Sequence, residues 1–99
     1  MAATPESKVK KKVIKVLDSL GAYWFYPVAS GFGKSGVPDI IACWRGRFVA
    51  IECKANGGKV TALQARELSR IGAADGIAVI VDENNVGELM TVLWGFFDN

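Results

Sequence analysis

Two acidic residues and a lysine, Asp39, Glu52 and Lys54, are the side chains of this sequence best suited to chemistry. Asp39 follows Pro38, and Glu52 and Lys54 flank Cys53. Opposed carboxylates repel each other unless a cation offsets their charge, and Mg²⁺ prefers oxygen ligands of this kind. A bound metal stabilises charge on a phosphate and activates water, which a nearby lysine could orient or deprotonate. The residue types therefore predict metal-assisted hydrolysis of a phosphodiester.

A β-hairpin would bring these residues together. The sequence predicts strands over residues 39–44 and 48–54, on either side of a tight turn that begins at Arg45-Gly46. If the loop has two residues, Asp39 lies directly opposite Glu52, with Cβ atoms about 4.5–5.5 Å apart. Lys54 shares that face because side chains alternate along a strand. A one-residue change of register would separate the group, so the prediction depends on the turn.

The same spacing leaves other interpretations open. An Asp/Glu/Lys ion-pair cluster at a sheet edge, or a carboxylate site for another small ligand, needs the same residues. The alternation also places Cys43 and Cys53 on opposite faces, so we expect two free thiols. Cys53 is then expected to face the core, which leaves its carbonyl available to a cation.

Composition excludes several kinds of chemistry. The 99 residues contain no histidine, which rules out Ser-His-Asp and Cys-His triads and histidine zinc ligands. Two cysteines cannot form a zinc ribbon. No stretch approaches the roughly 18–20 apolar residues of a membrane span. The N-terminus lacks an apolar signal core, so we expect a cytoplasmic protein.

The net charge of +2 is unevenly distributed. Residues 1–15 hold five lysines and one glutamate, a net charge of +4, so the rest of the chain carries −2. Such a basic helix could contact phosphates, or could be an ordinary solvated face.

The predicted elements fit one domain over residues 1–99 with the order α-β-β-β-α-β-α. Thr4-Pro5-Glu6 predicts a helix start, and Gly21 a helix end. The apolar stripe of this first helix is Val9, Val13, Val16, Leu17 and Leu20. The other predicted elements are strands over 23–28, 39–44, 48–54 and 77–81, and helices over 61–74 and from about 85. The uniform hydrophobicity of Ile77 to Val81 predicts burial on both sides.

A glycine-rich loop over residues 29–37 contains two motifs that resemble phosphate-binding sequences. Gly31 to Gly36 matches G-x-G-x-x-G, and Gly33-Lys34-Ser35 resembles the end of a P-loop. Both motifs must lead into a helix. Because Val37-Pro38 follows and begins a strand, we predict no nucleotide site here.

Pro38-Asp39 with Glu52-Cys53-Lys54 resembles the PD-(D/E)XK nuclease superfamily. Glu6 in the first helix, the loop before Gly36-Val37-Pro38-Asp39, and Thr61-x-x-Gln64 extend the likeness to the VRR-NUC family, in its short phage and bacterial form. The resemblance implies an α/β fold: a restriction-endonuclease-like αβββαβ core with a mixed central sheet flanked by helices. It also implies Mg²⁺- or Mn²⁺-dependent DNA cleavage.

The resemblance assigns a role to each matching residue. Asp39, Glu52 and the Cys53 carbonyl become metal ligands, and Lys54 the catalytic lysine. Glu6 becomes an auxiliary acid and Gln64 an auxiliary active-site residue. Glu6 could instead complement the helix dipole. Gln64 could instead close a capping box with Thr61, and both roles could hold.

The resemblance further implies a homodimer acting on branched DNA such as four-way junctions. The tail Leu93 to Phe97 is a candidate dimer surface, with core packing as the alternative. A junction-binding module with weak or no catalysis, and another PD-(D/E)XK junction resolvase, are the alternative functions. The candidate phosphate contacts are Lys8, Lys11, Lys12, Lys15, Lys34 and Lys59.

Overall fold

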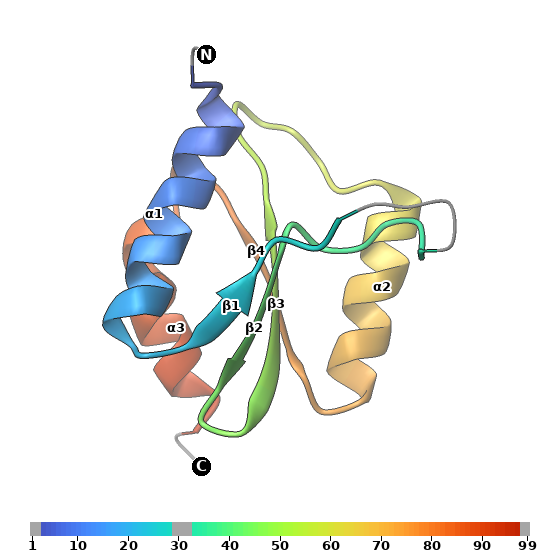
Figure 1. The fold of residues 1–99 in the computed structure, drawn as a ribbon. Coiled ribbons are helices and arrows are strands. Elements are labelled where there is room, and N and C mark those ends of the chain that lie inside the picture. The colour runs from blue at the N-terminus through green and yellow to red at the C-terminus, as the bar shows by residue number, and fades with distance from the viewer. Residues whose placement is uncertain (1–2, 29–32, 98–99) are drawn as a thin grey trace.

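A four-stranded sheet with helices on both faces organises the computed structural model, which describes residues 3–28 and 33–97 (Figure 1). The strand order is β1-β2-β3-β4; β1, β2 and β3 pair antiparallel, and β4 pairs parallel to β3. Helices α1 and α3 cover one face and α2 covers the other (Figure 1). The elements are α1 (Pro5–Ser19), β1 (Tyr23–Phe25), β2 (Ile40–Trp44), β3 (Arg47–Cys53), α2 (Ala62–Ala73), β4 (Ile77–Val81), the 3₁₀ turn η1 (Val86–Glu88) and α3 (Leu89–Gly95). The predicted α/β class and αβββαβ order are confirmed.

Helix α1 begins and ends at the predicted signals. The Thr4 hydroxyl accepts a hydrogen bond from the Ser7 amide at 3.1 Å, a cap worth about 1 kcal/mol. Gly21 ends the helix with a positive φ of 72°, which a residue without Cβ adopts readily. The apolar stripe faces the main core: Val9, Val13 and Leu17 are buried, and Val16 and Leu20 pack beside them.

The hairpin has the register on which the site prediction depends. Trp44 pairs with Arg47, and Ile40 pairs with Ile51. Arg45 and Gly46 both have positive φ, 53° and 79°, as a two-residue type I′ turn requires. Asp39 immediately precedes β2, so the register carries it opposite Glu52, the second-last residue of β3.

The structure differs from the predictions mainly at the end of β1, at the start of the last helix and in the burial of β4. Strand β1 ends at Phe25 rather than at residue 28, and Pro27, which has no amide to donate to a ladder, lies just beyond it. A 3₁₀ turn, η1, precedes the last α-helix. The expectation that Ile77 to Val81 is buried on both sides is wrong. Strand β4 lies at the edge of the sheet, and Ile80 is 46% exposed because α2 covers only part of this face.

The segment that leads to β2 packs tightly against the start of α2. Gly36 has a φ of 77°, and a Cβ there would lie 2.5 Å from the Leu63 carbonyl carbon and oxygen. Only glycine fits this contact without a shift of the backbone. The predicted loop over 29–37 lies partly outside the described residues; its described end, from Gly33, runs into β2 and not into a helix.

The aromatic tail is only partly packed into the core. Leu93 is fully buried, and the Trp44 ring contacts the rings of Trp94 and Phe97 at centroid distances of 4.9 and 5.2 Å. Trp94 and Phe96 keep part of their surface exposed. Among the helices of residues 3–28 and 33–97, none combines the length and the apolar character needed to cross a bilayer.

Candidate active site

Three carboxylates from separate parts of the chain converge at one end of the sheet. Glu6 comes from the first turn of α1, Asp39 from the residue before β2, and Glu52 from the end of β3. One oxygen from each lies within 4.8 Å of the others. The hairpin places Asp39 and Glu52, and the start of α1 adds Glu6. The sequence-based grouping of these three residues therefore agrees with the structure.

Glu52 is the most unusual member because it is 1% exposed. Neither of its carboxylate oxygens accepts a hydrogen bond of good geometry from the described residues. Burial, together with the negative charge of Asp39, raises the pKa of Glu52 to about 7, and Lys54 opposes this rise. Buried charges normally have partners. An unsatisfied buried carboxylate beside two further acids is thus the donor set that a divalent cation with oxygen ligands would complete.

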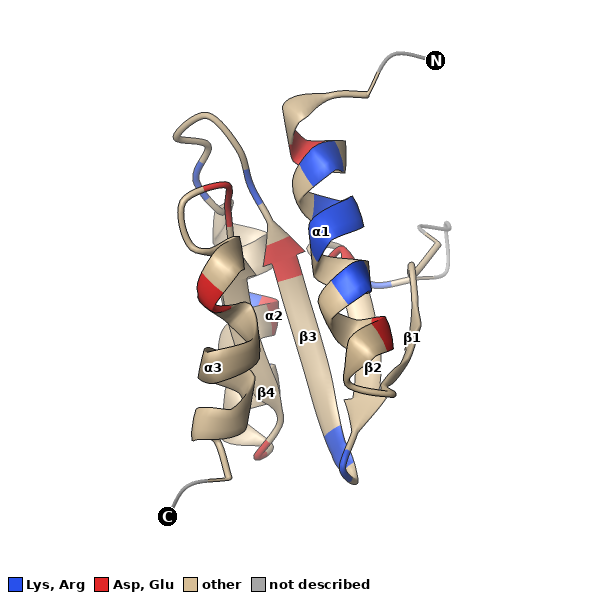
Figure 2. Cartoon of the chain, turned by 90° about the vertical axis from the view of Figure 1, so that its left-hand side faces the viewer, with Lys and Arg blue, Asp and Glu red and all other residues tan. Residues whose placement is uncertain are grey.

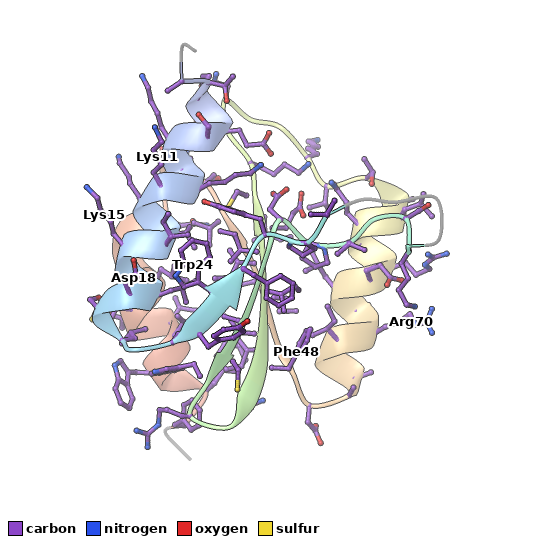
Figure 3. The ribbon with its side chains drawn as sticks, in the orientation of Figure 1. Lys11, Lys15, Asp18, Trp24, Phe48 and Arg70 are labelled. Carbon is purple, nitrogen blue, oxygen red and sulfur yellow. The ribbon has the colours of Figure 1, made fainter. Side chains whose placement is uncertain are left out.

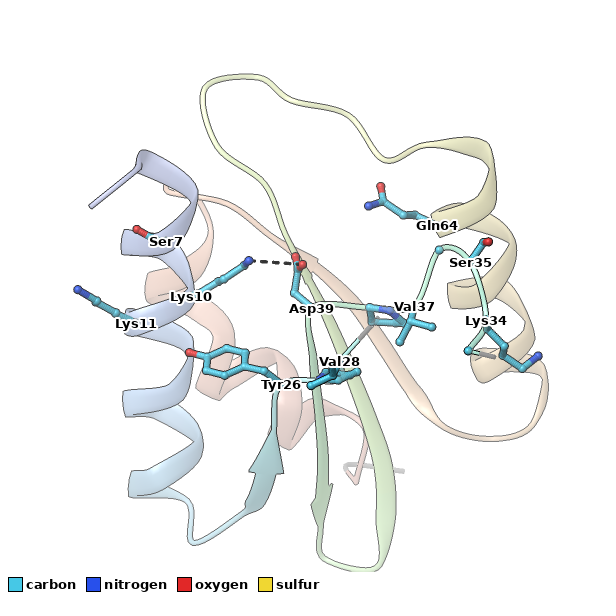
Figure 4. Close-up of a pocket in the computed structure, with 14 residues that line it drawn as sticks. Ser7, Lys10, Lys11, Tyr26, Val28, Lys34, Ser35, Val37, Asp39 and Gln64 are labelled. Carbon is cyan, nitrogen blue, oxygen red and sulfur yellow. Dashed lines mark ion pairs between the residues drawn. The ribbon is translucent and has the colours of Figure 1, made fainter. Parts of the chain in front are cut away.

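Two lysines contact the acids from different directions. Lys54 Nζ lies 3.3 Å from Glu52 Oε2, and its side chain is mostly buried. Lys10 Nζ lies 3.6 Å from Asp39 Oδ1 (Figure 4). Lys54 was predicted to share the face of Glu52, and this is confirmed. Sequence reasoning did not single out Lys10 among the helix lysines, although it lies one helical turn after Glu6 and therefore on the same face of α1.

The backbone at the end of β3 fixes Asp39. The Cys53 amide donates a hydrogen bond of 2.8 Å to Asp39 Oδ2, which orients the carboxylate towards the end of the sheet. Cys53 itself is buried and Cys43 is exposed, and both are free thiols, as predicted. Burial, reinforced by the charge of Asp39, raises the pKa of Cys53 to about 12, so its thiol stays protonated and unreactive.

Gln64 performs the capping role. Its Oε1 accepts a hydrogen bond from the Thr61 amide at 2.9 Å, and the Thr61 hydroxyl accepts one from the Gln64 amide at 3.2 Å. The same side chain also lines the hollow that contains Asp39 and Lys10 (Figure 4). Capping uses only the amide oxygen, which leaves the Nε2 donor available to a ligand in that hollow.

Two hollows flank the carboxylate cluster. The larger, about 860 Å³, lies between α1 and the start of α2 and includes Asp39, Lys10 and Gln64 (Figure 4). The smaller, about 390 Å³, includes Glu6 and Lys54. The cluster is therefore reachable from both sides.

The predicted phosphate-contacting lysines separate into two groups. Lys11 and Lys34 line the larger hollow, and Lys59 lines the smaller one. Lys8, Lys12 and Lys15 are exposed on α1 and line neither hollow. Figure 2 shows the basic residues along the outer surface of α1, next to the acidic end of β3. Three of these six lysines thus line the hollows, and the other three lie on the exposed surface of α1.

A second buried acid, Glu67 on α2, was missed by sequence reasoning. Its carboxylate lies 3.2 Å from Arg66 Nε, 3.7 Å from Lys34 Nζ and 3.8 Å from Arg70 Nη1. The spacing of Gln64, Glu67 and Ile71 on one helical face is the signal that could have identified it.

Comparisons with known proteins were made in sequence and in structure. No family model matches the chain. "Putative nuclease p44" of Acyrthosiphon pisum secondary endosymbiont phage 1 is 28% identical over 86 residues, which cover 86% of this chain and 90% of the relative. A solved structure described as a VRR_NUC domain superposes with a TM-score of 0.74 at 24% identity, covering 90% of this chain and 97% of that one.

The αβββαβ core and the acid–lysine set at its sheet end have the arrangement that the resemblance to PD-(D/E)XK nucleases implied. More particularly, the chain has the fold of a VRR_NUC domain. The resemblance to the VRR-NUC family, drawn above from a few short motifs, is confirmed.

Proposed function

We propose that this protein is a VRR-NUC-type nuclease, a divalent-metal-dependent DNA endonuclease that acts on branched DNA. The observation that carries the proposal is the approach of Glu6, Asp39 and Glu52 to within 4.8 Å, with Lys54 3.3 Å from Glu52. The phage relative, itself named as a nuclease, and the VRR_NUC fold support the same activity.

Asp39 and Glu52 are the proposed metal ligands, with the Cys53 carbonyl as a further ligand and Glu6 as an auxiliary acid. Mg²⁺ or Mn²⁺ at this site would polarise the phosphate and lower the pKa of a bound water. The three acids would hold the cation, whose charge would offset the repulsion between their carboxylates and a DNA phosphate. The two carboxylate oxygens of buried Glu52 accept no described hydrogen bond and are therefore available as ligands.

Lys54 is the proposed catalytic lysine. Its ammonium group reaches Glu52 from the smaller hollow, where an attacking water could enter. From there it orients or deprotonates the water, or stabilises charge on the phosphate. Gln64 offers its amide nitrogen from the opposite hollow and is an auxiliary contact to the DNA backbone.

The proposed path of the DNA follows the lysine side chains around the site. Lys11 and Lys34 at the larger hollow, Lys59 at the smaller one, and the exposed row Lys8, Lys12 and Lys15 on α1 bind phosphates on either side of the cut. The selectivity for four-way junctions comes from the VRR-NUC resemblance. So does the homodimer, whose two sites would make paired incisions. We place its action in the cytoplasm of a bacterium or phage-infected host, where such DNA occurs.

The decisive experiment is incubation of the protein with labelled duplex, flap and four-way-junction DNA of one sequence, with Mg²⁺, with Mn²⁺ and with EDTA. Cleavage of branched DNA with either metal, and none in EDTA, is the expected result. Tight binding without metal-dependent product would instead identify a junction-binding module. Equal cleavage of duplex and junction would refute the selectivity but not the nuclease.

Lysine variants test the path separately. Replacing Lys8, Lys12 and Lys15 by glutamine should weaken binding to every DNA and reduce its salt dependence, because fewer counterions are released. If the salt dependence of DNA binding were unchanged, these α1 lysines would not be part of the DNA interface. Sedimentation at micromolar concentration tests the dimer, and a monomer there would contradict it.

A further inference from the structure

A third hollow, which contains none of Glu6, Asp39 and Glu52, lies between the sheet and α2. It has a volume of about 500 Å³ and a mainly apolar lining that includes Phe25, Ile41, Phe48 and Ile71. Phe25 pairs with Ile41 across β1 and β2, and residues paired across strands share a face, here the one that α2 covers. We call this hollow the α2 groove.

The α2 groove exposes aromatic surface that core packing does not use. Phe25 is 46% exposed and Phe48 is 49% exposed. Figure 3 shows Phe48 on the α2 side of the sheet and Arg70 on α2. Aromatic rings with one face open are the platforms on which unstacked bases pack.

Positive charge lines one side of the α2 groove. Lys34 and Arg70 line the groove together with the buried carboxylate of Glu67, from which they lie 3.7 and 3.8 Å, so the lining keeps a net positive charge. Two cations fixed beside an apolar slot match a ligand with a flat ring and a phosphate. A purely apolar protein partner has no need for them.

The groove is continuous with the proposed active site. Lys34, Val37 and Pro38 line both the α2 groove and the larger hollow, and Asp39 follows Pro38 directly. A nucleotide chain with one phosphate at Asp39 therefore has a neighbouring base within reach of the groove.

We infer that the α2 groove binds an unpaired base of the DNA next to the cleaved phosphate. The inference rests on the proposed function and deepens it by naming what the protein recognises in branched DNA that carries an unpaired strand, such as a flap. A base inside a duplex has both faces stacked and cannot lie on Phe25 or Phe48, whereas an unpaired base can. The groove thus selects DNA that has unpaired nucleotides at the cut.

Binding measurements in EDTA test the inference without cleavage. Fluorescence anisotropy would compare a labelled blunt duplex with the same duplex carrying a short single-stranded flap. The wild-type protein should prefer the flap, and Phe25→Ala and Phe48→Ala should each reduce this preference roughly tenfold while duplex affinity stays unchanged. Phe48→Leu, which keeps apolar volume but lacks the ring, should behave like Phe48→Ala.

Matched controls come from residues next to the groove. Tyr23 is 72% exposed, lies 6.4 Å from the Phe25 ring and does not line the groove, so Tyr23→Ala should keep the flap preference. Arg70→Ala should weaken flap binding more than Arg66→Ala, because Arg66 contacts Glu67 from outside the groove. Melting curves confirm that each variant is folded.

Two results would overturn the inference. One is a flap preference that the groove variants leave intact. The other is loss of self-association in those variants with flap preference retained, which would assign the groove to a second copy of the chain. Failure of the proposed function is distinguishable, because a protein that prefers flaps in EDTA but never cleaves DNA refutes the nuclease and leaves the groove standing.

Discussion

The two buried glutamates, Glu52 and Glu67, are held in opposite ways. Glu67 is surrounded by Lys34, Arg66 and Arg70, all within 3.8 Å of its carboxylate. Glu52 has one lysine at 3.3 Å and two further acids within 4.8 Å. Both glutamates have less than a tenth of their surface exposed, so burial alone does not distinguish them.

The difference lies in charge compensation. A buried ion is tolerated when partners replace its lost hydration, which the three cations do for Glu67. The group around Glu52 keeps an excess of negative charge even after Lys10 and Lys54 are counted. Glu67 therefore forms a structural contact whose charge is already compensated, and it positions the basic side chains around it. Glu52 belongs to a site that needs a further positive charge, which is why we assign chemistry to one and not to the other.

The largest expected effect is on the rate of DNA cleavage, which should depend on Glu52 and its lysine partner but not on Glu67. Glu52→Gln should lower metal-dependent cleavage at least about a hundredfold, since a metal ligand is lost, and Lys54→Ala should do the same. Glu67→Gln should retain most of the activity. The measurement is the initial rate of junction cleavage in Mn²⁺. Comparable losses of cleavage rate in both glutamine variants would contradict the distinction between Glu52 and Glu67.

A divalent metal should stabilise the folded protein only by binding to the cluster of Glu6, Asp39 and Glu52. At about one hundred times its dissociation constant, Mn²⁺ should add roughly 3 kcal/mol to the free energy of unfolding at pH 8. Denaturant titrations with and without metal measure this gain. It should vanish in Asp39→Asn and persist in Glu67→Gln; a gain that survives in Asp39→Asn places the cation elsewhere.

The stability of the metal-free protein should depend on pH through Glu52. Because folding raises the pKa of this group from 4.5 to about 7, the folded state binds its proton more tightly than the unfolded state. Its contribution is fully present below pH 4.5 and is lost as the pH rises through 7, by about 3 kcal/mol at most. Urea midpoints from pH 4 to 8 should fall in the wild type, and Glu52→Gln should flatten this part of the profile. An identical slope in the variant would remove Glu52 as its source.

The smallest effect should come from Lys10. Its ammonium group near Asp39 competes with an incoming cation, so Lys10→Ala should tighten Mn²⁺ binding, by about fivefold at most for a pair whose side chains are 31% and 22% exposed. Lys11→Ala is the control for general charge, because no described acid lies within ion-pairing distance of Lys11. Calorimetric titration separates the two. Equal changes in both variants would mean that only the overall charge of α1 matters.

Local signals in the sequence account for most of the fold. The Thr4 cap, Gly21 and the Arg45-Gly46 turn each act within a few residues, and each has the predicted effect. The hairpin register then follows, and with it the approach of Asp39 to Glu52. Strand β4 shows the limit: an apolar run reports that a strand is partly buried, but its place at the sheet edge depends on which other strands exist.

The site was predictable where it depends on pairing within one hairpin, and less so elsewhere. Lys10 pairs with Asp39 and Glu67 pairs with Lys34 across segments distant in sequence, and no local spacing specifies these two contacts. Gln64 shows a third case. The capping box that the sequence suggested is present, and the structure adds that the same side chain borders the Asp39 hollow.

The Arg45-Gly46 turn bears on how this protein tolerates insertions and deletions. It lies at the far end of the hairpin and contributes no group to the carboxylate cluster, yet its length decides which residue of β3 faces Asp39. One added residue there would turn the Glu52 face of β3 towards the main core. By contrast, the exposed stretch from Asn56 to Lys59 lies outside every strand pairing. We therefore expect the fold to tolerate added residues better at that stretch than at the turn, where the positive φ of Gly46 also disfavours a side chain.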